Sequence, residues 1–159
     1  MNKSDLIELL KTYKENKAKL NIKLKELKVA RIKLKSLEET ETSLTTSYGV
    51  NQDIHSKNQI SNKVLNKIEE KESKAEQLEK EIKELEELVR ELREKVEAVD
   101  DRLIGLKYKE REILTAYYVE GRTAEEIGNK LYFQLFNQTR SDRHIQRIIE
   151  KATNKMLKL

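Results

Sequence analysis

Apolar residues recur at alternating steps of three and four along residues 4–39, which is the spacing of one face of a helix. The stripe is imperfect, because Lys17 and Arg31 occupy two of its positions. Ser4 precedes the stretch as a favourable helix N-cap, so we predict one long helix over 4–39. Its inward side chains are expected to be those of Leu6, Leu10, Tyr13, Leu20, Leu24, Leu27 and Leu34.

A second and more regular stripe covers residues 61–107. Only Lys71 interrupts it, and the apolar positions continue for about six heptads, which is typical of a coiled coil. We therefore predict a second long helix. Its inward positions are Val64, Ile68, Ala75, Leu78, Ile82, Leu85, Val89, Leu92, Val96, Val99, Leu103 and Leu106.

Residues 40–60 separate the two stripes, are rich in threonine, serine and asparagine, and contain Gly49. They are predicted to form a connector that lets the chain fold back. The charges of the two helices favour this return. Residues 11–35 carry ten basic and two acidic side chains, a net charge of +8, whereas residues 69–97 carry seven basic and twelve acidic ones, a net charge of −5.

We therefore expect a long antiparallel helical hairpin, a coiled coil, over residues 1–100. The alternative is parallel self-association of the second helix, which would place many glutamates side by side. The two arrangements are compatible, because hairpins can pair into a four-helix bundle, and a homodimer through the coiled coil stays open. A separate nucleic-acid surface on the basic helix also stays open, although its pairing with the acidic helix is the simpler explanation.

Composition agrees with an all-α protein. The 159 residues include no proline, cysteine or tryptophan, 39% are charged and 5% are aromatic. Without cysteine, a disulfide framework, thiol catalysis and cysteine-based zinc sites are excluded. No apolar run approaches the roughly 20 residues that span a bilayer, and no signal-peptide pattern opens the chain, so we expect a soluble, cytoplasmic protein.

The pattern changes from about residue 101, where shorter amphipathic segments begin. Gly121 is a suitable helix-ending residue. Thr123 and Glu126 then form a capping-box pair before a short helix with Ile127 and Leu131 inward. Gly128 leaves room there for a neighbouring helix. Ser141 is expected to cap a last helix, whose inward residues are Ile145, Ile148, Ile149, Ala152, Met156 and Leu157.

This order of segments, KEREIL, YYVEGRTAEEIGNKL and SDRHIQRIIEKATNKML, resembles region 4 of bacterial sigma factors. Matching positions are Thr123, Glu125, Glu126, Ile127, Leu131, Ser141 and Ile145, while Gly128 replaces the usual alanine. A long helical part followed by such a module is similar to phage late transcription regulators of the ArpU and RinA type. The resemblance covers residues 101–159 and implies a helix-turn-helix DNA-binding domain there.

One segment departs from the family pattern. Residues 132–140, YFQLFNQTR, stand where the family has two or three residues, and they contain both phenylalanines of the chain. Tyr132, Phe133, Leu135 and Phe136 are too apolar for an ordinary solvated loop. Either the preceding helix continues for two more turns, or the segment packs against another surface.

The resemblance implies that the last helix reads double-stranded DNA. Residues 130–159 carry seven basic and two acidic side chains, a net charge of +5. Arginine can pair with guanine and glutamine with adenine, so base-reading candidates are Arg143, His144, Gln146 and Arg147. Candidates for phosphate contact are Arg122, Arg140, Ser141, Lys151 and Lys155. The competing interpretation is a solvated helix face.

The expected function is a sequence-specific transcription regulator from a phage or prophage, with RNA polymerase as a further partner that the resemblance suggests. Alternatives are a small terminase-like DNA-packaging subunit and a helical protein-protein scaffold. We expect no enzyme, cofactor or metal site. His55 and His144 lack a metal-ligand spacing, and neither a phosphate-binding glycine loop nor a G-x-S-x-G motif is present.

Overall fold

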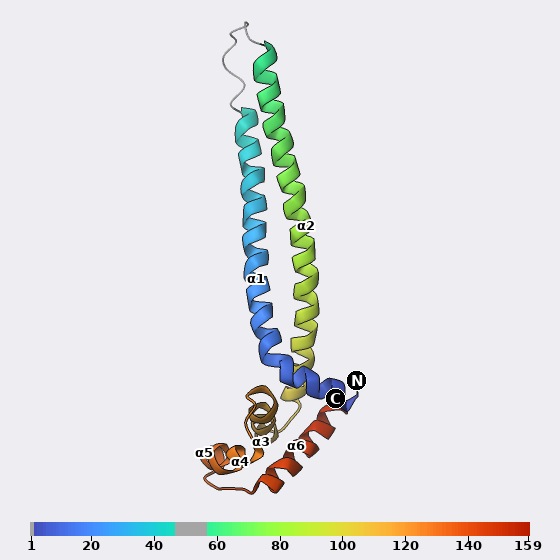
Figure 1. Cartoon of the computed structure of the whole chain (residues 1–159), viewed down its shortest axis with the longest axis vertical. Coiled ribbons are helices and arrows are strands. Elements are labelled where there is room, and N and C mark those ends of the chain that lie inside the picture. Colours follow the sequence, from blue (N-terminus) through green and yellow to red (C-terminus); the bar gives the residue numbers. More distant parts are fainter. Residues whose placement is uncertain (1, 47–56) are drawn as a thin grey trace. The chain divides into compact units, whose positions relative to one another are not determined.

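The computed structural model describes the backbone of residues 2–46 and 57–159, and the side chains of residues 2–39, 66 and 68–159. Every regular element in this part of the chain is helical, so the all-α class is confirmed. In chain order the elements are α1 (Lys3–Thr46), α2 (Lys57–Ile104), α3 (Tyr108–Leu114), η2 (Thr115–Val119), α4 (Ala124–Glu126), η3 (Ile127–Leu131), α5 (Tyr132–Phe136) and α6 (Asp142–Met156) (Figure 1).

The two long helices extend further into the expected connector than predicted. α1 continues past residue 39 to Thr46, and α2 begins at Lys57 rather than at 61. Threonine and serine are only weakly unfavourable in a helix, and no glycine or proline interrupts either extension. The remaining part of the connector, residues 47–56, lies outside the described residues, together with Gly49 and His55.

The chain divides into two compact units. The central unit is Asn21–Arg90, and the terminal unit combines Met1–Leu20 with Glu91–Leu159. Each long helix therefore contributes one part to each unit. The expected domain limit at residue 100 does not coincide with this division, because the first turns of α1 pack with the C-terminal helices.

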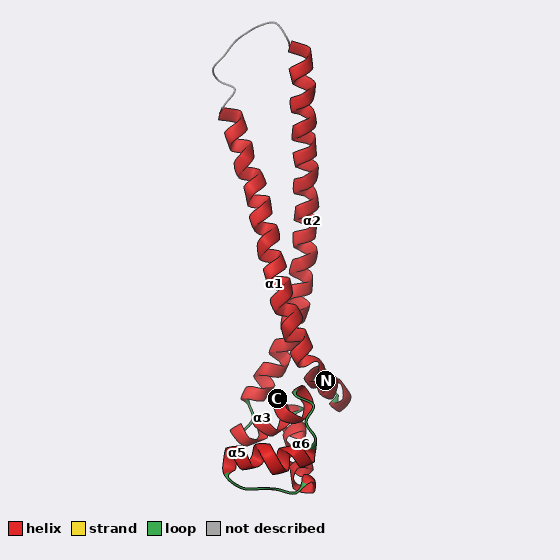
Figure 2. Cartoon of the chain, turned by 60° about the vertical axis from the view of Figure 1, so that its left-hand side comes forward, coloured by secondary structure: helices red, strands yellow, loops and turns green. Residues whose placement is uncertain are grey.

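In the central unit, α1 and α2 run antiparallel and share one apolar seam (Figure 2). A guanidinium nitrogen of Arg31 lies 2.6 Å from a carboxylate oxygen of Glu86, so these two residues lie next to each other across the seam. The buried side chains of the seam are Leu27 and Ala30 on α1, and Ile82, Leu85 and Val89 on α2.

Three details of the predicted stripes were wrong. Ala30, not Arg31, fills the position after Leu27, and Arg31 lies at the exposed edge of the seam. Leu24 and Ile68 were expected inward but are exposed. Adjacent helical positions differ by 100° around the axis, so a stripe with two polar interruptions leaves its exact centre undefined. Val64 lies outside the described side chains.

In the terminal unit, the start of α1 and the end of α2 form one core with the C-terminal helices. The hydroxyl of Tyr13 donates a 2.6 Å hydrogen bond to the carboxylate of Asp100 and accepts one of 2.9 Å from Lys17. Burial, together with the bond to Asp100, raises the pKa of Tyr13. The core consists of Leu6, Leu10, Val99, Leu103, Leu106, Leu114, Ala152 and Met156.

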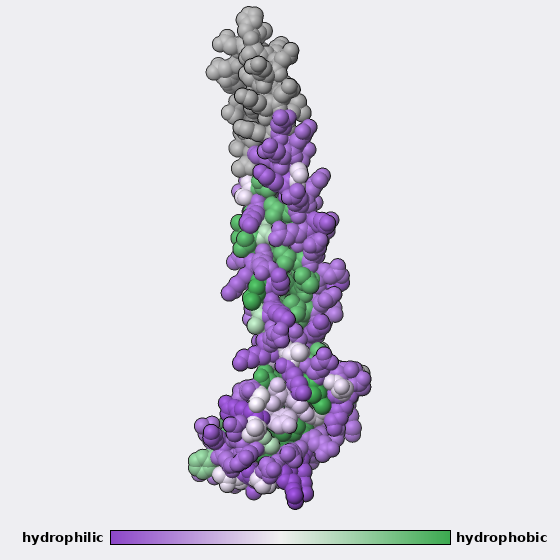
Figure 3. All heavy atoms as spheres, viewed as in Figure 1, coloured by the Kyte–Doolittle hydropathy of each residue, from purple (hydrophilic) through white to green (hydrophobic). Residues whose placement is uncertain are grey.

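Hydrophilic residues cover most of the visible surface, with smaller hydrophobic areas between them (Figure 3). None of the described helices combines the length and the apolar character that crossing a membrane requires.

Candidate nucleic-acid interface

Three helical segments in the terminal unit pack against one another around a second apolar core. The first is α3 with η2, the second is α4 with η3 and α5, and the third is α6. Their shared core contains Ile113, Ala116, Ala124, Ile127, Tyr132, Ile145 and Ile149. The sequence-distant members of this core determine where the outward face of α6 lies.

The second segment begins with the predicted capping box. The backbone N–H of Glu126 donates to the hydroxyl of Thr123 at 3.2 Å, and the backbone N–H of Thr123 donates to the Glu126 carboxylate at 3.1 Å. The Glu126 carboxylate also accepts a 3.2 Å hydrogen bond from the Thr123 hydroxyl, and the bonds that it accepts from the backbone and side chain of Thr123 lower the pKa of Glu126. Just upstream, Gly121 has a φ of 71°, a left-handed conformation that suits glycine. The predicted start of this helix is confirmed.

Residues 132–136 of the segment 132–140 continue the preceding helix, as one of the two expectations proposed. Helical backbone runs without a break from Ala124 to Phe136, and Asn137 ends it in a left-handed conformation with a φ of 53°. Tyr132 is buried in the core, whereas Phe133 is exposed. The extra apolar residues therefore lengthen the helix and also add to the core.

Gly128 is required by a backbone contact rather than by a neighbouring helix. The N–H of Arg140 donates a 3.1 Å hydrogen bond to the carbonyl oxygen of Gly128. A Cβ atom at position 128 would lie 2.1 Å from the carbonyl oxygen of Arg140, well inside contact distance. An alanine at position 128 would not fit without a shift of the backbone. This close approach places the loop before α6, at Arg140, against the helix formed by residues 124–136.

A cation–tyrosine cluster, formed by Lys109, Tyr132 and Arg140, joins α3, α5 and the loop that precedes α6. The ammonium group of Lys109 donates to the Tyr132 hydroxyl and also lies 4.5 Å from the centre of its ring. The Arg140 guanidinium lies 5.8 Å from the same centre. Burial alone would raise the pKa of Tyr132, but hydrogen bonds from these two cations lower it.

Sequence reasoning missed the role of Lys109. It precedes Tyr132 by 23 positions, on a different helix, and no local spacing connects the two. The only signal was the unusual apolar character of residues 132–136, which indicated that the segment packs against something.

α6 is a 15-residue amphipathic helix, and most of its inward face is buried. Ser141 occupies its N-cap position, but the serine side chain makes no capping hydrogen bond, in contrast to the expectation. Instead, the carboxylate of Asp142 accepts a 2.6 Å hydrogen bond from the backbone N–H of Arg143. The inward residues are Ile145, Ile149, Ala152, Thr153 and Met156, with Ile148 and Leu157 half-buried.

The outward face of α6 carries the predicted base-reading residues. Arg143, Gln146 and Arg147 are exposed, and His144 is half-buried. Arg143 and Arg147 lie one turn apart and therefore share one side of the helix. Within the described residues, neither arginine side chain makes an ion pair or hydrogen bond, so both positive charges face solvent unpaired.

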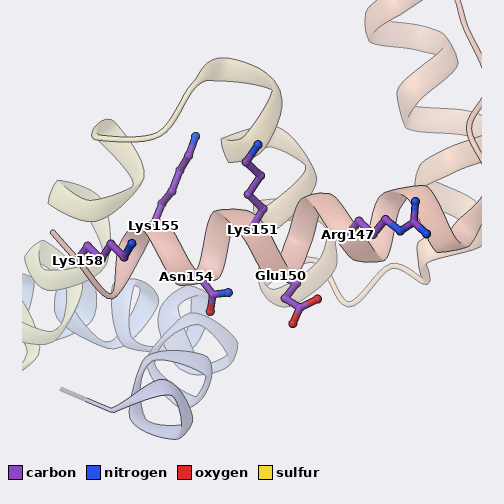
Figure 4. Close-up of a pocket in the computed structure, with 6 residues that line it drawn as sticks. All are labelled: Arg147, Glu150, Lys151, Asn154, Lys155 and Lys158. Atoms are coloured by element: carbon purple, nitrogen blue, oxygen red, sulfur yellow. The ribbon is translucent and has the colours of Figure 1, made fainter.

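The basic face continues towards the C-terminal end of α6, where it borders a shallow hollow (Figure 4). Figure 4 shows Lys151 and Lys155 leaving one side of the helix, and Glu150 and Asn154 leaving the other. Lys151 is exposed and has no ion-pair partner in the described part of the chain. All the lining residues lie on α6 or directly after it, so the hollow is a surface feature of one helix: Arg147, Glu150, Lys151, Asn154, Lys155 and Lys158.

Lys155 differs from the other phosphate candidates because its ammonium group forms an intramolecular ion pair with a carboxylate on α3. Its ammonium lies 2.6 Å and 2.7 Å from the two carboxylate oxygens of Glu110 on α3. Burial raises the pKa of Glu110, but the hydrogen bonds from Lys155 and the backbone of Lys107 lower it further, and the net change is a decrease. The geometry therefore gives Lys155 a structural role in holding α6 to α3.

The remaining phosphate candidates are exposed. Arg122 forms a 2.7 Å ion pair with Glu120, and Arg140 donates a 2.8 Å hydrogen bond to the side-chain oxygen of Gln138. Exposed pairs of this kind contribute little stability, so a bound anion could replace Glu120 at Arg122, or Gln138 at Arg140, at a small cost in free energy. Ser141 is also exposed, at the N-terminus of α6.

Within the part of the chain that the structure describes, no group of three or more acidic or histidine side chains is placed to hold a metal ion. The outward face of α6 offers polar and charged side chains for contact with a partner. Comparison with known proteins gives no match to this chain among family models, curated proteins or solved structures.

Proposed function

We propose that the chain is a sequence-specific double-stranded DNA-binding protein that uses α6 as its recognition helix. One observation carries the proposal. α6 is held to the protein by a continuous apolar face, and its opposite face presents Arg143 and Arg147 with no intramolecular ion pair in the described residues. An unneutralised basic helix face of this kind fits the major groove, which admits one α-helix.

The arrangement of the preceding helix supports the same proposal. In a helix-turn-helix, the first helix crosses the DNA backbone, and the second places its N-terminal residues on base edges. We assign these roles to the helix 124–136 and to α6. Arg143 and Arg147 would pair with guanine, Gln146 with adenine, and His144 would contact the edge of the same site.

Phosphate contacts would position this helix without reading sequence. Arg122, Arg140 and Ser141 lie before the recognition helix, and Lys151 lies two turns into it. Because Gly128 and Tyr132 hold the Arg140 segment against the second helix, we expect the position of Arg140 to depend on both residues.

The two long helices suit a hairpin coiled coil that carries the DNA-binding part. With the resemblance of residues 101–159 to region 4 of sigma factors, this supports a regulator of the phage late-gene type. It would work in the cytoplasm of a bacterial host and contact RNA polymerase as well as DNA.

The experiment selects bound duplexes from a randomised pool and measures their affinity by fluorescence polarisation at several salt concentrations. Replacing Arg143 and Arg147 by alanine should lower affinity for the selected sequence by at least about tenfold and remove the sequence preference. Lys151→Ala should instead weaken binding to all sequences alike and reduce the slope of log affinity against log salt by about one.

A matched control removes two exposed arginines from α2, with Arg90→Ala and Arg93→Ala. This variant loses the same charge, so it should retain the sequence preference. If the wild-type protein shows no salt-dependent DNA binding, the chain is a scaffold rather than a DNA-binding protein. If both double variants lose affinity equally, α6 is not the reading helix.

A further inference from the structure

A second apolar stripe runs along α1 in the central unit, on the side away from α2. Its positions alternate by three and four residues, as in a coiled-coil seam: Ile22, Lys25, Val29, Ile32 and Ser36. Ile22 is 55% exposed, Val29 50% and Ile32 58%, whereas Leu27 and Ala30 on the opposite side are buried against α2. α1 therefore has two helix-packing faces, and only the one towards α2 has a partner among the described residues.

Lysines surround the outer stripe. Lys25 lies within it, and Lys28 and Lys33 flank it. None of these three side chains makes an ion pair in the described residues, whereas Arg31 nearby pairs with Glu86 of α2. The acidic helix therefore does not neutralise the outer side of the basic helix. A hollow on the surface of α1 includes Ile32 of this stripe. It is lined by Leu24, Leu27, Lys28, Arg31, Ile32 and Lys35.

A second copy of α1 does not fit this surface. In an antiparallel pair that sets Ile22 opposite Ile32, Lys28 would face Lys28 of the second copy. A parallel pair would bring two copies of Lys25 together inside the seam. Like charges placed opposite each other destabilise helix pairing.

The α2 helix of a second copy has the right charge but lacks the matching stripe. In the described residues of the central unit, its exposed large apolar side chains are Ile68 and Leu88, which lie far apart along the helix. Nucleic acid would use the lysines but would leave three exposed aliphatic side chains without contacts. A complementary partner therefore needs apolar side chains to cover the aliphatic stripe and acidic side chains to pair with the lysines.

We propose that this outer face of α1 docks an amphipathic helix of another protein, with an apolar stripe flanked by glutamate or aspartate. The partner's aliphatic side chains pack on Ile22, Val29 and Ile32 over about 15 Å, which is three helical turns. Its acidic side chains pair with Lys28 and Lys33, and one acidic residue in its stripe meets Lys25. The interaction is separate from the DNA-binding face of α6.

The test uses a fluorescent helical peptide of three heptads, with leucine at the a and d positions, one glutamate in the stripe, and glutamate on both flanks. A second peptide carries lysine at the same flanking positions. Binding to the full chain is measured by fluorescence anisotropy. We expect saturable binding of the acidic peptide and no binding of the lysine peptide.

Replacing Ile22, Val29 and Ile32 by serine should weaken acidic-peptide binding at least about tenfold, because the buried apolar area is lost. The control is Leu88→Ser, which removes an exposed leucine on α2 and should leave binding unchanged. Lys25→Glu with Lys28→Glu should reverse the preference between the two peptides. Circular dichroism should show that all variants remain helical.

Three outcomes overturn the proposal. Equal binding of both peptides, or equal binding by wild type and the triple serine variant, excludes docking on this stripe. A dimer in sedimentation velocity that the triple variant abolishes makes the surface a self-interface. A loss of DNA affinity in the Lys25→Glu, Lys28→Glu variant assigns the surface to nucleic acid. The α6 variants leave peptide binding intact in every case, so failure here is distinguishable from failure of the proposed function.

Discussion

The central and terminal units bury their apolar residues in different ways. The ten largest side chains with almost no exposure all lie in the terminal unit, where several helices surround them: Tyr132, Leu6, Leu10, Ile113, Leu114, Ile127, Ile145, Met156, Val99 and Thr153. In the central unit, buried apolar residues form a single line between two helices, and each keeps a small exposed fraction. A two-helix seam has solvent on both sides, whereas three packed helices enclose a volume.

The difference has a consequence for function. The enclosed core of the terminal unit fixes the outward face of α6, as the proposed recognition of DNA would require. The two-helix seam leaves most of the α1 circumference uncovered, and the outer stripe remains available to another helix. The first turns of α1 thus pack in the core of the terminal unit, whereas its part in the central unit keeps an exposed apolar face.

The largest expected contrast is between two leucine truncations. Leu114→Ala in the terminal unit should lower the free energy of unfolding by about 3 kcal/mol, because the enclosed site cannot collapse. Leu85→Ala in the central seam should cost about 2 kcal/mol or less, since two helices can move together. Urea unfolding measures both, with circular dichroism for all helices and tyrosine fluorescence for the terminal unit.

Tyrosine fluorescence separates the units because five of the six tyrosines lie in the terminal one. If both variants lose the same free energy of unfolding, the seam and the core are equally enclosed. In that case the two units also unfold together.

A smaller contrast comes from two glycines of the terminal unit. Gly128→Ala should destabilise by about 2 kcal/mol, because the new Cβ meets the Arg140 carbonyl oxygen and must displace backbone. Gly121→Ala meets no atom within 4 Å and should cost about 1 kcal/mol, from the positive φ alone. Thermal unfolding gives both values. A neutral or stabilising Gly128→Ala, as in an ordinary exposed helix, would show that the close approach is absent.

The link between α3 and α6 should depend on pH. Because the folded-state pKa of Glu110 is lowered, its charged form adds stability above the unfolded-state pKa, and this contribution is lost as the pH falls through the lowered folded-state pKa. Glu110→Gln should cost about 1 kcal/mol at neutral pH and flatten this part of the stability curve. Denaturant unfolding at several pH values tests it, and Glu112→Gln is the control on the same helix. An unchanged pH profile would exclude the pair as a contributor.

The smallest effect is expected at the edge of the central seam. Arg31 and Glu86 form an ion pair, but both side chains are about half exposed. Arg31→Ala should change stability by about 0.5 kcal/mol or less, and high salt should reduce the difference further. Thermal unfolding at low and high salt measures it. A loss above about 1 kcal/mol would place Arg31 inside the seam, as the stripe in the sequence first indicated.

Periodicity explains what could be predicted of the fold. The heptad pattern of residues 61–107 identified a long helix and most of its inward positions, because helical spacing is a local property of the chain. The capping box of Thr123 and Glu126 was equally local and was found at its predicted place. Where polar residues interrupted the stripe, as at Lys17 and Arg31, the inward side was assigned incorrectly near Leu24 and Ala30.

For the candidate site, the sequence identified the exposed basic residues of α6 but not what positions them. Lys109 and Glu110 act on Tyr132 and Lys155 from a helix far away in the chain, and spacing carries no information about such pairs. For the same reason, the intramolecular role of Lys155 could not be separated from a phosphate contact.

By itself, the sequence determined the all-helical class, the two long helices, the capped helix at residue 123 and the amphipathic face of α6. The tertiary structure decided that the start of α1 belongs to the core of the terminal unit and that Gly128 must be glycine. It also decided that, among the described residues, one side of α1 has no partner. Local hydrogen bonding and helical periodicity act over a few residues and are visible in the sequence. Packing between distant residues depends on which helix faces meet, and several arrangements satisfy the same local pattern.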